Sequence, residues 1–167
     1  YNFQEETFDL IKNLNAAEPL NKVTSVYGSD KEHAYLSARP DYRFPEEANT
    51  KNLFAHAKRL KKIGVDFWYT SNNIHIGKKT SIDITPLEDF IVLFTEAGIG
   101  MIVSYTFLLD IIKKCKVQPK VDLSNIMRIE SPGGFIAYKQ QFPFITKMFM
   151  HISYNRSFKL LKQFVKA

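Results

Sequence analysis

The chain is poor in cysteine: Cys115 is its one thiol in 167 residues. A single thiol excludes an intramolecular disulfide framework, and it excludes any metal cluster that one copy of the chain would hold through several cysteines. Cys115 follows aliphatic residues in an expected helix, so we expect a buried structural thiol. Because disulfide-free chains are typical of reducing compartments, we expect a cytoplasmic location.

Long hydrophobic runs are also missing. No apolar stretch approaches the roughly 20 residues that span a bilayer, and no basic segment followed by an apolar run stands at the start of the sequence. We therefore expect no membrane partner and no secretory signal.

The short motifs of common catalytic chemistry are absent too. The sequence has no glycine-rich phosphate loop after a strand, no His-Glu-x-x-His pair and no nucleophile elbow. Its four histidines are scattered, so no metal site is predicted and no cofactor is expected within this chain. Acidic residues near the expected strand ends are few, so no acid–base pair is evident and the catalytic residues stay unassigned.

The composition that remains is that of an ordinary globular protein, with 45% hydrophobic and 24% charged residues. This length is enough for one α/β domain over residues 1–167. The net charge of +6 has two interpretations. It favours a polyanionic partner such as RNA, or it reflects lysines on the solvated faces of helices, where residues such as Lys58, Lys113 and Lys162 are expected.

The chain repeats one pattern five times: a short apolar run, a cluster of small polar residues, then an amphipathic helical stretch. Strands are expected over residues 22–29, 65–71, 101–104, 120–124 and 147–153. After an opening helix over residues 3–14, helices are expected to begin near Asn49, Thr85, Thr106, Ser131 and Asn155. We expect His56 to be exposed on its helix, and Phe158, Leu161 and Val165 to form the buried stripe of the last helix.

This rhythm predicts an α/β fold, a parallel (βα) repeat in the form of a partial TIM-type barrel of about five strand–helix units. Eight units close such a barrel at about 250 residues. Five units could instead form an open doubly wound sheet, a truncated barrel, or a barrel completed by another copy or a partner chain, because bare sheet edges favour pairing.

Polar residues at the carboxyl ends of the strands are the candidate ligand-binding groups, since parallel strands bring these ends to one rim. Amides and hydroxyls there suit a polar or anionic ligand, and arginine offers two parallel donors to a carboxylate or phosphate. Helix capping explains Asn155 equally well, but it explains neither asparagine that follows the second strand. The candidates are Arg39, Asn72, Asn73, His75, Asn155 and Arg156.

The order of these strand ends resembles a known family. Val23-Thr-Ser-Val-Tyr-Gly-Ser29 is similar to the first strand of the collagenase-like peptidases (peptidase family U-32), and Ser37-Ala-Arg-Pro40 is similar to the loop that follows it. Residues 56–73 and 102–114 resemble the family's second and third units, and Asn155-Arg-Ser-Phe158 is similar to a family Asn-Arg-Asp-Phe tip. The resemblance covers nearly the whole chain in order.

The resemblance implies the N-terminal part of a TIM-type barrel, a hydrolase (peptidase) label, and a peptide or RNA substrate. Relatives hydroxylate RNA bases or act in quinone biosynthesis, and many hold an iron–sulfur cluster through cysteines further along the chain. Those cysteines are absent here, Ile74-His75-Ile76-Gly77 lacks a cysteine often found after the second strand, and Ser157 replaces the usual aspartate. The resemblance therefore supports the rim residues, and it implies a cluster only if further cysteine-bearing chain exists.

Overall fold

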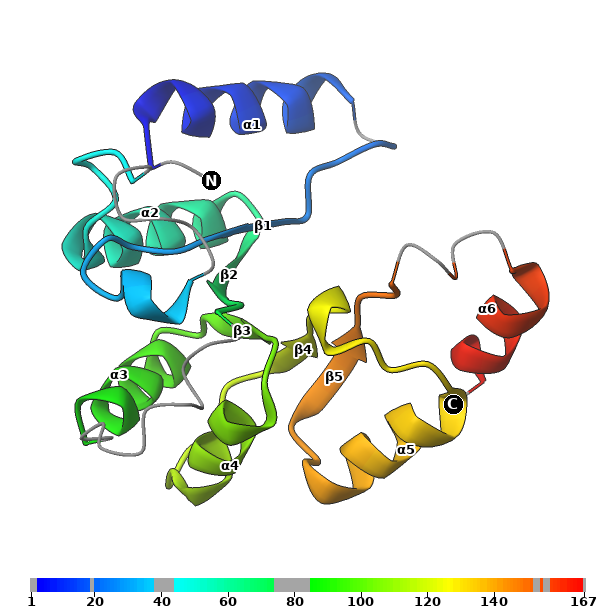
Figure 1. The fold of residues 1–167 in the computed structure, drawn as a ribbon. Coiled ribbons are helices and arrows are strands. Elements are labelled where there is room, and N and C mark those ends of the chain that lie inside the picture. Colours follow the sequence, from blue (N-terminus) through cyan, green and yellow to red (C-terminus); the bar gives the residue numbers. More distant parts are fainter. Residues whose placement is uncertain are drawn as a thin grey trace.

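All five strands of the sheet run in the same direction and in the order β1-β2-β3-β4-β5 (Figure 1). The computed structural model describes residues 3–18, 20–37, 44–73, 85–151, 154 and 157–166. The strands are β1 (Ser25–Gly28), β2 (Asp66–Ser71), β3 (Gly100–Val103), β4 (Val121–Leu123) and β5 (Ile145–Met148). The α-helices are α1 (Glu5–Ala17), α2 (Thr50–Lys62), α3 (Thr85–Glu96), α4 (Thr106–Lys114), α5 (Pro132–Gln141) and α6 (Phe158–Val165). Two 3₁₀ turns, η1 (Ala34–Leu36) and η4 (Asn125–Met127), complete the elements.

The strand order decides between the expected architectures. A doubly wound sheet reverses its winding partway, so consecutive strands do not follow one another across the whole sheet. Here each strand pairs with the next one in the chain, and α2, α3, α4 and α5 lie on one side of the sheet (Figure 1). The predicted parallel (βα) repeat is confirmed as a partial parallel α/β barrel, and the doubly wound alternative is wrong.

Strand β2 shows how the two faces of the sheet differ. Phe67, Tyr69 and Ser71 are buried, whereas Trp68 and Thr70 between them are half-buried, as the two-residue period of a strand requires. The ring of Tyr69 packs edge-on against Phe90 and Phe94 of α3, with ring centroids 5.3 and 4.8 Å apart. The hydrophobic core therefore lies between the sheet and the helices, and Trp68 and Thr70 belong to the opposite, concave face.

Local signals account for several helix boundaries. The side chain of Asn49 accepts a hydrogen bond from the backbone N–H of Asn52 at the start of α2, and Ser131 caps α5 through the N–H of Gly134. Gly64 and Gly98 end α2 and α3 with φ of +76° and +70°, which glycine adopts without strain. The predicted helix starts at Asn49 and Ser131 are confirmed.

Helix α4 begins at Thr106, as expected. Thr106 is the first helical residue, and the side chain of Tyr105 at the N-cap position makes no capping hydrogen bond to the helix. The hydroxyl of Thr106 lies 3.3 Å from that of Tyr138 instead. Thr106 therefore belongs to the first turn of α4 rather than to its cap.

The last unit also departs from prediction. Strand β5 spans Ile145–Met148 rather than residues 147–153, and α6 begins at Phe158 with Ser157, not Asn155, at its N-cap. The apolar run continues past Met148, the last residue of β5, because Phe149 and Met150 line a cavity on the concave face, so hydrophobicity alone misplaced the end of the strand.

Two of the three residues in the expected buried stripe of α6 are exposed, and the third, Leu161, is half-buried. Phe158 and Val165 keep 77% and 88% of their surface in solvent. A helical stripe is buried only where a neighbouring strand or helix covers it. Phe164 of α6 packs against the core, so the periodicity predicted an amphipathic helix correctly but not which of its residues are covered.

Helix α1 covers one side of α2 and explains a second difference. His56, expected to be exposed, retains 6% of its surface; its ring packs edge-on against Phe3, and its Nε2 lies 3.7 Å from a carboxylate oxygen of Glu5. Arg59 of α2 donates to Glu5 Oε2 over 2.7 Å and stacks 4.2 Å from the ring centroid of Phe8. Burial lowers the pKa of His56 below its ordinary value.

Two further expectations concern Cys115 and membranes. Cys115 is buried after α4, with its thiol 3.5 Å from the carbonyl oxygen of Ile111, as expected for a structural thiol. Across the described ranges, no helix has both the length and the apolar character needed to cross a bilayer.

Candidate functional site

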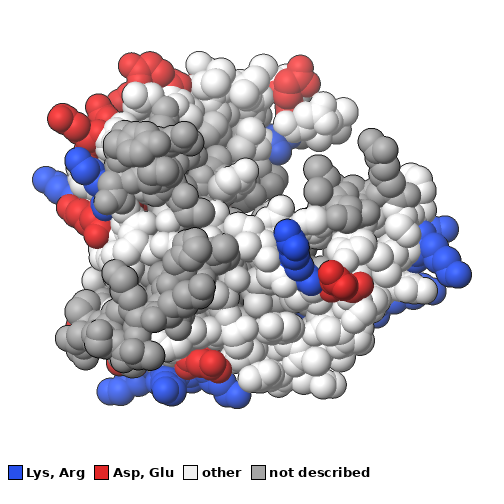
Figure 2. Space-filling view, in the orientation of Figure 1, with Lys and Arg blue, Asp and Glu red and all other residues white. Residues whose placement is uncertain are grey.

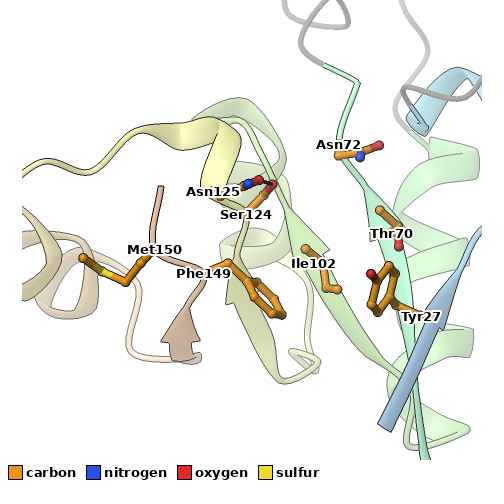
Figure 3. A pocket seen from close by; sticks show the side chains of 8 residues that line it. All are labelled: Tyr27, Thr70, Asn72, Ile102, Ser124, Asn125, Phe149 and Met150. Carbon is orange, nitrogen blue, oxygen red and sulfur yellow. Dashed lines mark hydrogen bonds between the residues drawn. The ribbon is translucent and has the colours of Figure 1, made fainter. Parts of the chain in front are cut away.

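A cavity of about 440 Å³ lies on the concave face, at the carboxyl ends of the strands (Figure 3). Figure 2 shows the molecule hollowed on this side, between the part that holds β1 and the part that holds α6. Every strand contributes to the lining, directly or through the residues that follow it. The lining residues are Tyr27, Thr70, Asn72, Ile102, Ser124, Asn125, Phe149 and Met150.

Sheet register builds the floor of this cavity. Thr70 of β2 pairs with Ile102 of β3, so their side chains stand side by side on the same face. Tyr27 and Phe149 flank Ile102 from opposite sides in Figure 3, and they are 62% and 43% exposed. Two aromatic rings across an aliphatic floor provide apolar walls for a flat ligand.

Amides and hydroxyls form the rim. Asn72 follows β2, and Ser124 and Asn125 follow β4. Ser124 caps η4 by accepting a 3.3 Å hydrogen bond from the N–H of Ile126, and its hydroxyl donates to Oδ1 of Asn125 over 3.4 Å. Ser124 therefore fixes the turn that carries Asn125 at the cavity edge.

Thr70 supplies an unusual feature of the floor. Its Oγ1 is buried, and it has no hydrogen-bond partner in the part of the chain that the structure describes. Buried hydroxyls are nearly always hydrogen-bonded, to protein, to ligand or to ordered water. A polar group seated in the cavity can provide that missing partner.

A charged and aromatic group lies next to the cavity on the same face. The ammonium of Lys147 is 3.2 Å from Oδ2 of Asp122, 5.2 Å from the ring centroid of Trp68 and 6.0 Å from that of Phe149. Asp122 is 1% exposed and accepts a 2.5 Å hydrogen bond from Oγ1 of Thr146. Burial raises the pKa of Asp122, against the opposing effects of Thr146 and Lys147. The pair balances its own charge, and the cavity lining itself contains no Lys, Arg, Asp or Glu.

A second polar cluster, missed by sequence reasoning, lies on the helix side of the sheet. Asp30 is fully buried and accepts hydrogen bonds from Thr50 Oγ1 at 2.6 Å and Tyr69 OH at 3.1 Å, and its Oδ2 lies 2.9 Å from Nδ1 of His33. The ring of His33 stacks on Phe90 with centroids 3.9 Å apart.

The electrostatics of this cluster favour a charged Asp30. Burial acts to raise the pKa of Asp30, but hydrogen bonds from His33, Thr50 and Tyr69 outweigh it and hold that pKa below its usual value. The cluster ties β1, β2, α2 and η1 together. Asp30 and His33 are three residues apart in a polar stretch, but their partners Thr50 and Tyr69 are 20 and 39 residues from Asp30 and carry no local signal.

The predicted site residues fall into three groups. Asn72 lines the cavity. Asn73 is engaged by η1, because its side-chain amide donates to the carbonyl of Tyr35 over 2.7 Å and its backbone N–H to that of Leu36 over 3.0 Å. The remaining predictions, Arg39, His75, Asn155 and Arg156, lie outside the described residues.

Sequence reasoning did not single out Thr70, Ile102 or Phe149 as lining residues. Strand alternation carries a signal for them: a residue two positions before a rim residue on the same strand shares its face, as Thr70 does with Asn72. Because only small polar residues at the strand ends were considered, the apolar floor and walls of the cavity were not predicted.

The residues present do not fit the iron–sulfur cluster that the resemblance implies. Such clusters need several cysteine thiolates, whereas the chain has one thiol, and it is buried after α4. Within the described ranges, no group of three or more His, Cys, Asp or Glu side chains could hold a metal ion.

The fold and the cavity define a partial parallel α/β barrel with a ligand-sized hollow at the carboxyl ends of its strands. Compared with family models, with curated proteins and with solved structures, the chain matches none at a significant level.

Proposed function

We propose that this chain binds a small polar ligand with a flat ring in the cavity on its concave face, as an incomplete barrel of the collagenase-like peptidase type would at its rim. The observation that carries this proposal is the buried, unpartnered hydroxyl of Thr70 in the described structure, at the floor of a cavity with aromatic walls and an amide rim. A ring between Tyr27 and Phe149 would meet apolar surface, and its polar edge would meet Asn72 and Asn125.

The chemistry of the lining favours binding over hydrolysis. Among the described lining residues there is no carboxylate pair, no histidine and no thiol to act as acid, base or nucleophile. The lining also carries no formal charge at neutral pH. These walls suit a neutral ligand, or a ligand with one partially negative group, better than they suit a multiply charged ligand.

Thr70→Val tests the proposal because valine keeps the shape and removes the hydroxyl. We expect binding of neutral nucleosides or monosaccharides, measured by saturation-transfer NMR, to weaken about tenfold. The free energy of unfolding should stay the same or rise, since an unsatisfied buried hydroxyl stabilises nothing.

Thr146→Val is the matched control. Its hydroxyl is hydrogen-bonded to Asp122 outside the cavity lining, so this change should lower stability and leave binding intact. If Thr70→Val destabilises the fold as Thr146→Val does, or if none of these probes binds the unmodified chain, the proposal is wrong.

RNA is the second candidate ligand, supported by the net charge of +6. The affinity for RNA bound through scattered lysines would fall steeply with salt and would not depend on the residues of the cavity floor. A linear fall of log affinity for a single-stranded RNA with log salt, unchanged in Thr70→Val, would favour this second function.

A further inference from the structure

The two ends of the sheet are open in the described structure. Strands β1 and β5 each pair with one neighbour, so each leaves a row of backbone N–H and C=O groups on its outer side. Such edges are templates for pairing with another strand. Helix α1 lies at the β1 end and α6 at the β5 end (Figure 1).

The helices at these two ends carry opposite charge. Acidic side chains gather over α1 and basic ones over α6 (Figure 2). Helix α1 contains Glu5, Glu6 and Asp9 against the single Lys12. Helix α6 contains Lys159 and Lys162 and no acidic residue.

Each of these helices also exposes a stripe that mixes apolar and charged side chains. Positions four apart share a helix face, so Glu6, Leu10 and Leu14 form one stripe of α1, in which the leucines are 58% and 43% exposed. We call this stripe the acidic end surface.

The matching stripe of α6 consists of Phe158, Lys162 and Val165, which we call the basic end surface. Phe158 and Val165 are among the most exposed large hydrophobic residues of the described chain, and Lys162 lies between them on the same face. Exposed apolar side chains interleaved with one sign of charge are typical of interaction surfaces.

We propose that a second copy of this chain docks head to tail, with the acidic end surface of one copy against the basic end surface of the next. Apolar stripes would then pack together while Glu6 faces Lys162. This arrangement also brings β1 of one copy towards β5 of the other, where their edges can pair in parallel.

Charge selects this polarity over the alternatives. Two acidic end surfaces in contact would oppose their carboxylates, and two basic end surfaces would oppose their lysines. The interface is therefore heterologous, and it closes into a ring or grows into a chain depending on the rotation between copies.

Paired charge reversals test the proposal. Variant one carries Glu6→Lys and Asp9→Lys, and variant two carries Lys159→Glu and Lys162→Glu. Sedimentation velocity at about 0.01 M salt should show the unmodified chain self-associating and each variant alone weakened at least about tenfold. Mixing the two variants should restore association, because every contact in the mixture again joins opposite charges.

A control pair makes the same change in net charge as variant two, at another place. Lys113→Glu with Lys114→Glu alters exposed residues of α4, away from both end surfaces, and should leave self-association unchanged. Circular dichroism spectra of all variants should match that of the unmodified chain.

Three results would overturn the proposal. The unmodified chain could remain a monomer at low salt, the two variants could fail to associate when mixed, or the α4 control could weaken association as much as the end-surface reversals do. A mixture that fails while each variant still self-associates alone would indicate a symmetric interface elsewhere.

Discussion

The hydroxyl of Tyr69 donates a hydrogen bond to Oδ1 of Asp30 over 3.1 Å, joining the middle of β2 to the residues that follow β1. Both groups are fully buried, and Asp30 also accepts from Thr50. A buried carboxylate is stable only when its lone pairs are satisfied. Tyr69 is therefore a polar anchor in an otherwise aromatic core.

Tyr69→Phe should lower the free energy of unfolding by about 1.5–3 kcal/mol at pH 7, the usual value of a hydrogen bond to a charged group. Asp30 has a lowered pKa, so its contribution is present above the unfolded value of about 3.9 and is lost as pH falls through the folded pKa. The loss in free energy of unfolding that Tyr69→Phe causes should therefore be smaller in acid than at pH 7. Urea unfolding at pH 7 and near pH 3 measures both values.

Tyr105→Phe is the control for that pH dependence. Tyr105 shares a 3.2 Å hydrogen bond with Ser71, and burial raises its pKa to about 12, so both partners stay neutral throughout the range. Tyr105→Phe should lower the free energy of unfolding by about 0.5–1.5 kcal/mol at both pH values. If Tyr69→Phe lowers the free energy of unfolding by the same amount at the two pH values, the role assigned to Asp30 is contradicted.

Gly100→Ala should destabilise the fold by about 1–3 kcal/mol. A Cβ atom at Gly100 would come within 2.5–2.8 Å of two ring atoms of Trp68 and closer still to a third, so the indole would have to move. Because Trp68 is the single tryptophan, its fluorescence reports that movement directly.

Gly133→Ala is the matched control within α5. No atom lies within 4 Å of the Cβ it would add, and alanine favours the helix by about 0.5–1 kcal/mol over glycine. Urea unfolding should show the two substitutions acting in opposite directions. An unchanged emission spectrum in Gly100→Ala would mean that the ring does not rest on this glycine.

Local signals in the sequence were enough to predict the architecture and to single out Asn72 at the cavity, but not the apolar floor of the cavity or the cluster around Asp30. Alternation along Val65–Ser71 and the caps at Asn49 and Ser131 depend on near neighbours, and these predictions were confirmed. The polar cluster around Asp30 depends on contacts with residues far along the chain, which no local pattern encodes. The exposed stripe of α6 depends on what lies beside it, which helical periodicity does not contain.

His56 should make the fold sensitive to mild acid. Burial lowers its folded pKa, Glu5 opposes that shift and Arg59 adds to it. A lowered folded pKa means that the unfolded chain binds the proton more readily, so stability falls as pH drops below about 6.5. In His56→Gln, the free energy of unfolding should fall less between about pH 7.5 and 5.5 than it does in the unmodified chain. An unchanged slope would mean that His56 is not the cause of the acid sensitivity.

Asn72 and Asn73 should respond differently to alanine substitution. Asn73→Ala removes the 2.7 Å hydrogen bond to the carbonyl of Tyr35 and should cost about 1 kcal/mol of stability. Asn72→Ala should change stability by under about 1 kcal/mol and weaken ligand binding, because the side chain lines the cavity. Thermal unfolding of both variants, with NMR binding on Asn72→Ala, separates the two roles.

The sequential strand order has a consequence for how this chain forms and changes. Since each strand pairs with the one next in sequence, every strand pairing of the described sheet joins neighbouring βα units. The sheet can be assembled in the order in which a ribosome delivers it, with each finished unit serving as the template for the next. Whole units could be added or removed at either end without disturbing the pairing of those that remain, so the barrel behaves as a linear array.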